Sequence, residues 1–147
     1  MNAFTGVPGW ETLYDREVTL VSAGEGVAVG RLTGRWAGVS YSVRIEYRGE
    51  GSEHTSSDFF TALARVRDDL QREGLKPAVQ GACRDVYPSR MALEMGGGRR
   101  AYRWPTEGRP AIVDIFAAVP EADYDQLATT SEQSDLNDER RRRRNER

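Results

Sequence analysis

The sequence predicts an α+β domain of two layers, in which a mainly antiparallel sheet of five to seven strands is packed by one principal helix at about 57–73. Apolar residues recur with a helical period in 57–73, whereas in 39–47 they alternate with polar ones, as in a strand with one solvated face. The 147 residues are 38% hydrophobic, which is enough for one buried core. We expect a single domain over 1–130 and a charged, disordered tail at 131–147, with frayed helix as the alternative for the tail.

The N-terminal part predicts a hairpin followed by a long strand. Residues 1–16 show little periodicity and are interpreted as an arm that leads into the first strand. Two short strands at 17–22 and 27–32 are expected to pair across a turn that contains glycine. Residues 39–47 are expected to form a half-buried strand, and the polar segment 49–55 is expected to be a loop.

The helix at 57–73 has one apolar face and recognisable ends. Ser56 or Ser57 is expected to cap its start, and Gly74 to end it. Four apolar side chains are spaced so that they share one side of the helix: Phe59, Leu63, Val66 and Leu70. Such a helix needs a sheet or another helix to pack against.

Beyond the helix the sequence predicts shorter strands and leaves two segments open. Residues 78–86 are small and mostly apolar and are interpreted as a strand. Residues 91–95 are expected to pair with 99–104 as a hairpin, but the helix-forming residues in 90–95 also allow a short helix. The apolar run 111–119 is interpreted as an interior strand, with a helix as the alternative.

Composition and motifs predict the cellular location of the protein and the kinds of reactive site that it can form. No run of about 18 apolar residues is long enough for a membrane span, and the first residues lack the profile of a secretory signal, so a cytoplasmic location is expected. Cys83 is the single cysteine and is interpreted as a buried structural thiol. His54 is the single histidine, and the spacing to Cys83 fits no metal site. We expect no metal, no cofactor and no catalytic set, and an enzymatic role is left open but is not favoured.

Charge is distributed unevenly along the chain. The net charge is −2, and residues 132–147 hold six Arg against five Asp and Glu, so the rest of the chain carries a net −3. A mildly acidic body disfavours nucleic-acid binding by the folded part, because such binding depends on a clustered basic face.

One candidate ligand site is a cluster of polar and aromatic residues after the helix. Guanidinium groups can hold a carboxylate or phosphate, and a tyrosine can add a hydroxyl. The alternative, which the sequence favours, is that Asp85 pairs with a nearby arginine at the sheet edge and that Tyr87 and Pro88 only pack a turn. The cluster consists of Arg84, Asp85, Tyr87, Arg90 and Arg99.

The leading interpretation is a small protein-binding module that inhibits or neutralises another protein, as an immunity protein does. An acidic cluster is its candidate contact with a basic partner of unknown identity, and consists of Glu121, Asp123, Tyr124 and Asp125. Aromatic side chains that can serve as interface anchors are Trp10, Trp36, Trp104, Tyr87, Tyr102 and Tyr124.

Two alternative functions are kept. The first is a small-ligand or enzymatic domain that uses the cluster at 84–90. The second is a nucleic-acid accessory protein that binds through the C-terminal tail, although nearby acids offset part of the tail's charge. The candidate nucleic-acid residues are Arg140, Arg141, Arg142, Arg143 and Arg144.

Overall fold

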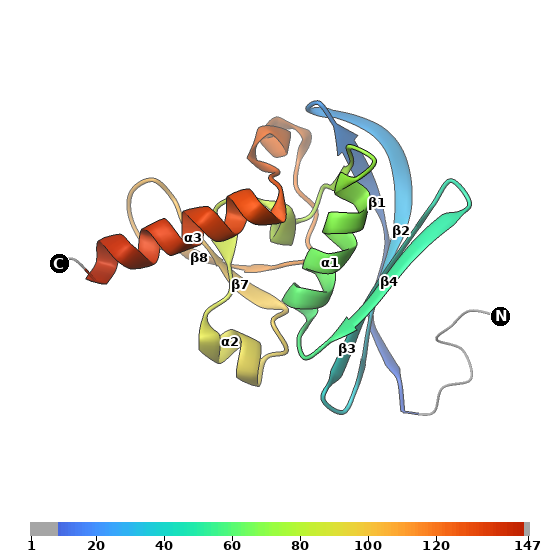
Figure 1. Ribbon diagram of the computed structural model, residues 1–147, viewed down its shortest axis with the longest axis horizontal. Helices are drawn as coiled ribbons and strands as arrows, with labels where there is room; N and C mark the ends of the chain where they lie inside the picture. The colour runs from blue at the N-terminus through green and yellow to red at the C-terminus, as the bar shows by residue number, and fades with distance from the viewer. Residues whose placement is uncertain (1–8, 146–147) are drawn as a thin grey trace.

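The computed structural model describes residues 9–145, and its largest feature is an antiparallel sheet of five strands in the order β4-β3-β2-β1-β5. The sheet curls around the helix α1 (Phe59–Gln71), as Figure 1 shows. The predicted α+β class and the mainly antiparallel pairing are therefore confirmed. The strands are β1 (Glu11–Ser22), β2 (Glu25–Ala37), β3 (Ser40–Tyr47), β4 (Glu50–Ser56) and β5 (Lys76–Pro77).

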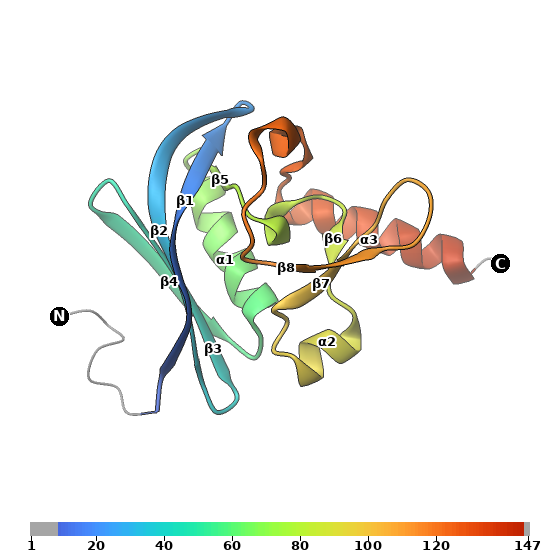
Figure 2. The same cartoon turned by 180° about the vertical axis from the view of Figure 1, so that it is seen from behind.

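The structure adds a second sheet of three strands in the order β6-β7-β8. Helix α1 lies between the two sheets, which Figure 2 shows from behind. The prediction of a single sheet in two layers is thus incomplete, because α1 is covered on both sides. The remaining elements are η1 (Gln80–Ala82), β6 (Val86–Tyr87), α2 (Arg90–Met95), β7 (Arg100–Arg103), β8 (Ala111–Asp114), η2 (Glu121–Gln126) and α3 (Thr130–Asn145).

The predicted β1–β2 hairpin is confirmed, but it is longer than expected. Ala23 and Gly24 connect the strands, both with positive φ (51° and 80°), as a tight hairpin turn requires. The expectation of an arm is wrong for 11–16, because these residues pair with β2 through the backbone. Tyr14 also stacks on the buried Phe116, with ring centroids 4.7 Å apart. Residues 1–8 of the predicted arm lie outside the described residues.

The strand expected at 39–47 is confirmed as β3, and Val43 and Ile45 on it are fully buried. Val39 instead lies in the turn before the strand and is 85% exposed. The predicted loop at 49–55 is wrong, since these residues form β4. Strand β4 lies at the edge of the sheet and is held by its backbone pairing with β3, so its side chains need not be apolar.

Helix α1 confirms the predicted apolar face, and its four ridge side chains are at most 1% exposed. Its cap differs from the prediction: Asp58, not Ser56 or Ser57, accepts a hydrogen bond from the Thr61 backbone N–H at 2.7 Å. Aspartate serves as an N-cap as well as serine does. Gly74 follows the helix with φ +72°, as the glycine stop requires.

Three segments after α1 differ from the strands that were predicted. Residues 78–86 are not one strand: only Val86–Tyr87 belongs to the second sheet, and Gln80–Ala82 forms a 3-10 turn. The predicted hairpin of 91–95 with 99–104 is wrong, and the alternative short helix is present as α2 because Ser89 caps its start. The run 111–119 is a strand only up to Asp114, whose carboxylate accepts the Phe116 backbone N–H at 2.9 Å and turns the chain.

Residues Thr130–Asn145 form a helix, α3, so the helical alternative for the tail describes them better than disorder does. Residues 146–147 lie outside the described residues. Thr129 and Glu132 form a capping box: the Glu132 N–H donates to Thr129 Oγ1 at 3.1 Å, and the Thr129 N–H donates to Glu132 Oε1 at 3.0 Å. No helix in the described part of the chain is long and apolar enough to cross a membrane.

Candidate functional site

Helix α3 is attached to the body by a buried polar contact with α1. The Gln133 side chain is 2% exposed, and its Oε1 accepts a hydrogen bond from Arg67 Nη1 at 2.7 Å. Its Nε2 donates to the carbonyl oxygens of Gly81 (2.9 Å) and Cys83 (2.8 Å). The first turns of α3 are thereby fixed against α1 and η1, and the later turns lie beside the second sheet.

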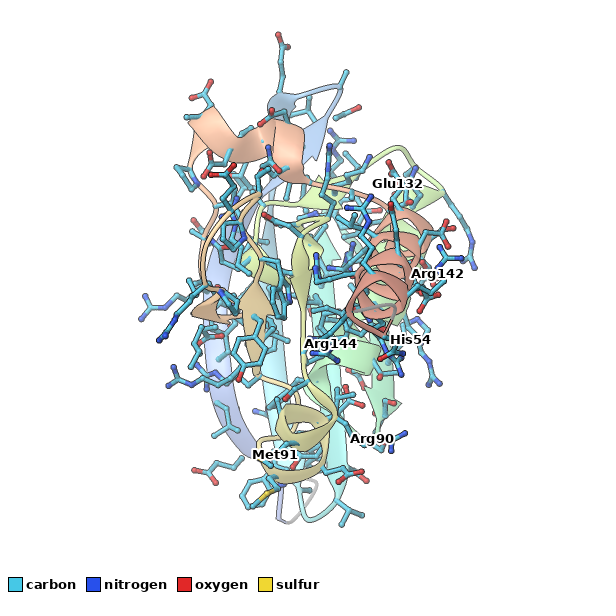
Figure 3. The ribbon with its side chains drawn as sticks, turned by 90° about the vertical axis from the view of Figure 1, so that its left-hand side faces the viewer. His54, Arg90, Met91, Glu132, Arg142 and Arg144 are labelled. Atoms are coloured by element: carbon cyan, nitrogen blue, oxygen red, sulfur yellow. The ribbon has the colours of Figure 1, made fainter. Side chains whose placement is uncertain are left out.

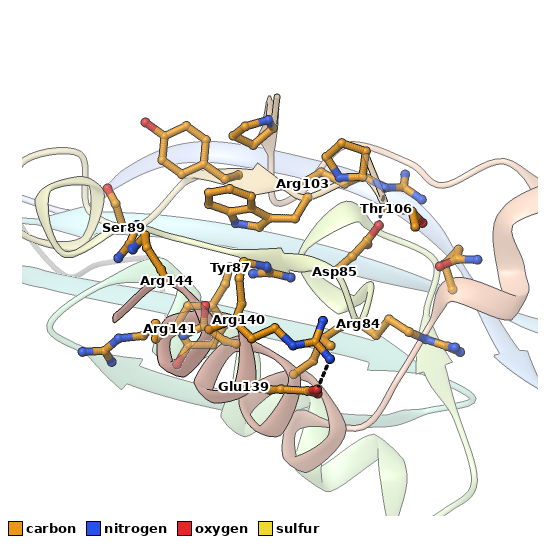
Figure 4. A pocket seen from close by; sticks show the side chains of 18 of the residues that line it. Arg84, Asp85, Tyr87, Ser89, Arg103, Thr106, Glu139, Arg140, Arg141 and Arg144 are labelled. Atoms are coloured by element: carbon orange, nitrogen blue, oxygen red, sulfur yellow. Dashed lines mark hydrogen bonds and ion pairs between the residues drawn. The ribbon is translucent and has the colours of Figure 1, made fainter. Parts of the chain in front are cut away.

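A groove of about 1620 Å³ separates α3 from β6, β7 and the loop after β7 (Figure 4). Three aromatic residues contribute to its walls: Tyr87, Tyr102 and Trp104. Three acids also line it: Asp85, Asp123 and Glu139. We name it the arginine groove after its seven arginines, which are Arg84, Arg90, Arg103, Arg140, Arg141, Arg143 and Arg144.

Two of these arginines form ion pairs within the groove. Arg103 contacts Asp85 (Nε to Oδ2, 3.3 Å) and Asp123 (Nη1 to Oδ2, 3.9 Å). Arg143 contacts Glu139 one helical turn earlier on α3, at 2.6 Å. The three acids are therefore used by two arginines, and the other five arginines form no ion pair within residues 9–145. The groove has a net positive charge on the wall that α3 provides.

Arg140 and Asp85 are central to the groove. The Arg140 guanidinium lies over the Trp104 ring, with its carbon 4.8 Å from the ring centroid, which is the geometry of a cation–π contact. Burial lowers the pKa of Arg140, and the negative charge of Asp85 opposes that shift. Arg140 Nη1 and Asp85 Oδ1 are both buried, and neither has a hydrogen-bond partner within the described chain. Buried polar atoms without a partner are costly, so both side chains lie in a part of the groove wall that is closed to solvent.

The predicted ligand cluster is divided by the structure. Arg84, Asp85, Tyr87 and Arg90 line the arginine groove. Arg99 is elsewhere: its Nε contacts Asp114 at 3.1 Å, and its Nη1 donates to the Leu13 carbonyl at 3.2 Å. The alternative that the sequence favoured, an ion pair between Asp85 and a nearby arginine, is present, because Arg103 Nε contacts Asp85 Oδ2 at 3.3 Å.

The predicted acidic cluster is also divided. Asp123 faces the arginine groove and contacts Arg103. Tyr124 is half-buried against the core, and Glu121 and Asp125 are exposed on η2. The Asp125 carbonyl accepts a hydrogen bond from Arg84. Of the four residues in the predicted cluster, Asp123 alone lines the arginine groove.

Four of the five predicted tail arginines line the groove. Arg142 does not, because it projects from another side of α3 than Arg144 (Figure 3). Sequence reasoning missed Arg103 and Glu139 as groove residues, and it did not bring 84–90 together with 140–144. The available signal was the Thr129 and Glu132 pair, whose spacing is that of a capping box and predicts a helix start.

The anchoring of α3 is expected to weaken in acid. Hydrogen bonds from the Thr129 backbone and side chain hold the pKa of Glu132 below its usual range. Because the folded pKa lies below the unfolded one, this contribution is present above about pH 4.5 and is lost as pH falls through the folded pKa. Urea unfolding at pH 7 to 3 should show a stability advantage of the native chain over Glu132→Gln that is constant near neutral pH and shrinks below pH 4.5. An advantage that grows in acid would contradict this capping role.

Ser52, His54 and Cys83 are residue types that often take part in catalysis, and their structural contacts are as follows. Ser52 Oγ donates to an oxygen of Asp69 at 2.5 Å, and His54 Nε2 contacts the same oxygen at 2.7 Å, so Asp69 is the partner of both side chains. The interpretation of Cys83 as a buried thiol is confirmed, and burial raises its pKa to about 11. Such a thiol is protonated at neutral pH and is a poor nucleophile. Residues 9–145 hold no cluster of three metal-ligating side chains.

A comparison with known protein families gives no match, and a search of the curated proteins gives none either.

Proposed function

We propose that this chain is a protein-binding module that docks onto another protein through the arginine groove and, by covering that protein's surface, acts as an inhibitor or immunity-type neutraliser. The observation that carries the proposal is the combination of Trp104, two tyrosines and five arginines without ion pairs on the walls of one groove. Trp, Tyr and Arg are the residues that contribute most to binding energy in protein interfaces. The proposal keeps the cytoplasmic location expected from the sequence.

The size of the groove supports a protein segment over a small molecule. Pockets for small molecules usually enclose about 300–1,000 Å³. The arginine groove exceeds this range at about 1620 Å³. A small ligand would leave much of its wall in water, whereas a protein segment would cover it. The alternative of a small-ligand or enzymatic domain is therefore less well supported by the geometry.

The charge of the groove changes the partner that was expected from the sequence. The acidic cluster suggested a basic partner, but Asp123 is already paired with Arg103. The unpaired charges on the groove wall are those of arginines, and they complement an acidic surface. The proposed partner is therefore acidic where it contacts the groove.

A second candidate function is supported by the position of Trp104 beside four α3 arginines. Aromatic rings next to cationic side chains bind single-stranded nucleic acid by stacking and charge. The net charge of −2 disfavours this candidate, because nucleic-acid binding depends on a clustered excess of basic residues.

The proposal is tested by site-specific photo-crosslinking in the native cell. A photoreactive residue at Thr106, an exposed residue of the groove, is expected to crosslink one protein that mass spectrometry identifies. The same residue at Val29, which is 59% exposed on β2, serves as the matched control and is expected to give no such product. Trp104→Ala should weaken binding of the purified partner by about tenfold or more. Equal crosslinking from both positions, or none from Thr106, would overturn the proposal.

A further inference from the structure

Strand β4 is an edge of the five-stranded sheet (Figure 1), and it differs from the other sheet edges in length and composition. It has seven residues, contains no proline or lysine, and pairs with β3 without a bulge. The opposite edge, β5, has two residues and includes Pro77. In the second sheet the edge strands have two and four residues, and they adjoin Pro88 and Pro110. Native proteins protect sheet edges with prolines, lysines, bulges or short strands, so β4 is the edge of the described chain that can accept a further strand.

The turn between β3 and β4 determines which backbone groups of β4 point outwards. Arg48 and Gly49 are the two turn residues, and both have positive φ (51° and 76°), as in a type I′ turn. The residue after such a turn donates its N–H to the carbonyl of the residue before it, so Glu50 directs its backbone groups to β3. Along an antiparallel strand this direction alternates from one residue to the next. The residues whose backbone groups point away from β3 are therefore Gly51, Glu53 and Thr55.

Hydrogen bonds on both sides of β4 agree with this assignment. From β3, the Ser42 hydroxyl donates to the His54 carbonyl at 3.4 Å. From α1, Arg65 Nη1 donates to the Thr55 carbonyl at 3.4 Å. Gly51 and Glu53 are exposed, and their backbone N–H and C=O groups have no partner within residues 9–145. These two residues thus present two donors and two acceptors to another strand.

A second copy of β4 is complementary to this edge when the two strands pair antiparallel about Ser52. In this register Gly51 of each copy lies opposite Glu53 of the other, and each such pair exchanges two backbone hydrogen bonds. The outward donors and acceptors of both residues are then all used. Pairing about Glu53 instead would set two carboxylates directly opposite each other, and like charges in that position destabilise a strand pair.

The charges beside β4 favour the same register. Glu50 of one copy lies opposite His54 of the other, on the face that α1 covers, since His54 Nε2 contacts Asp69 at 2.7 Å. Asp69 is also paired with Arg72 at 2.8 Å, whereas Arg65 forms no ion pair in the part of the chain that the structure describes. The carboxylate of Glu50 therefore meets more positive than negative charge, and such cross-strand pairs are stabilising.

We propose that this protein forms a two-fold dimer through β4, paired antiparallel about Ser52, so that two five-stranded sheets become one continuous sheet. Glu50 of each copy contacts His54 and Arg65 of the other. No β4 residue lines the arginine groove, so the dimer carries two such grooves, and the inference does not rest on the proposed function.

The first test is sedimentation velocity of the full chain over about 1 μM to 1 mM, a range suited to a small interface. The native chain is expected to change from monomer to dimer as its concentration rises. Glu53→Pro removes one outward N–H from each copy and no bond to β3, and proline is tolerated where its nitrogen faces solvent at an edge. It should raise the dissociation constant about tenfold or more.

Glu53→Ala is the matched control for the proline variant. It removes the side chain, which contacts Arg44 at 3.7 Å, but it keeps the backbone N–H. It should change the dissociation constant by no more than about threefold, because an exposed ion pair contributes little. Far-UV circular dichroism and urea unfolding establish that both variants are folded.

The second test is disulfide formation, which reports the register and does not need the proline variant. Ser52→Cys places two thiols on facing positions whose Cα atoms are about 4.5 Å apart, which suits a disulfide. Glu53→Cys is the matched control: the residue is more exposed, but its counterpart in the dimer is diagonal, at about 7–8 Å. Mild oxidation should crosslink Ser52→Cys, and should leave Glu53→Cys and the native chain, whose Cys83 is buried, without a crosslink.

The opposite results would overturn the inference. These are a native chain that stays monomeric at every concentration, and a dimer that Glu53→Pro does not weaken. Crosslinking of Glu53→Cys as fast as Ser52→Cys would indicate another register or mere collision. If Glu53→Pro does not fold, the absence of a crosslink from Ser52→Cys decides against the dimer. Crosslinking from Thr106 tests the proposed function separately, because Thr106 lines the arginine groove and is not on β4.

Discussion

Gln133→Leu is expected to lower the free energy of unfolding by about 3 kcal/mol, because it breaks the buried contact between α3 and α1. Arg67 is 4% exposed, and its guanidinium donates to Gln133 Oε1 and to the carbonyls of Gly81 and Ala128. Burial lowers the pKa of Arg67 to about 10, so the group still carries its charge at neutral pH. Leucine would remove an acceptor from a buried cation and leave the Cys83 carbonyl without the donor that Gln133 provides. Urea unfolding followed by circular dichroism measures the loss.

Two further variants separate this contact from a general effect of replacing glutamine. Gln71→Leu changes an exposed glutamine at the end of α1 and is expected to shift stability by no more than about 0.5 kcal/mol. Arg67→Met combined with Gln133→Leu removes both polar partners together, and it should cost less than the sum of the two single changes. Additive losses would show that Arg67 and Gln133 do not act as a pair. Hydrogen exchange of the α3 backbone amides in Gln133→Leu should show whether α3 opens before the rest of the chain unfolds.

The parts of the fold that were predicted correctly are those specified by the period of apolar residues. The ridge that includes Leu63 on α1 and the alternation around Val43 on β3 each determine which face is buried. Strand β4 was missed because it is an edge strand, and its stability comes from backbone pairing that polar side chains do not reveal. Helix α3 was predicted only as the alternative to a disordered tail, because its anchor is Gln133, a residue that sequence patterns treat as solvated.

The candidate site was only partly predictable for a related reason. Residues 84–90 and 140–144 are far apart in the sequence, and each shows only a local mixture of charges. They form one groove because Arg67, a charged residue of α1, is buried and binds Gln133. A buried contact between two polar side chains leaves no periodic pattern and no motif in the sequence. The sequence therefore shows which residues are present, but it does not show that they lie together in one groove.

Gly97→Ala is expected to lower the free energy of unfolding by about 3 kcal/mol. Gly97 is buried in the connection from α2 to β7 and has φ +64°. A Cβ there would lie 2.7 Å from Cζ of Tyr41, whose ring packs edge-on against Phe59 at 4.9 Å and has little freedom to move. The Gly97 carbonyl also accepts the Phe59 N–H at 2.6 Å, so any shift disturbs the start of α1. Chemical denaturation of the variant measures the loss.

Gly38→Ala is the matched control for this change. Gly38 has a similar φ of +60°, but a Cβ there meets nothing within 4 Å. It should therefore cost only about 1–2 kcal/mol for the left-handed backbone. The additional loss at Gly97 measures the contact with Tyr41, and in a Tyr41→Leu background it should shrink towards the Gly38 value. Equal losses at Gly97 and Gly38 in the native background would show that the α2–β7 connection adapts freely to the Tyr41 ring.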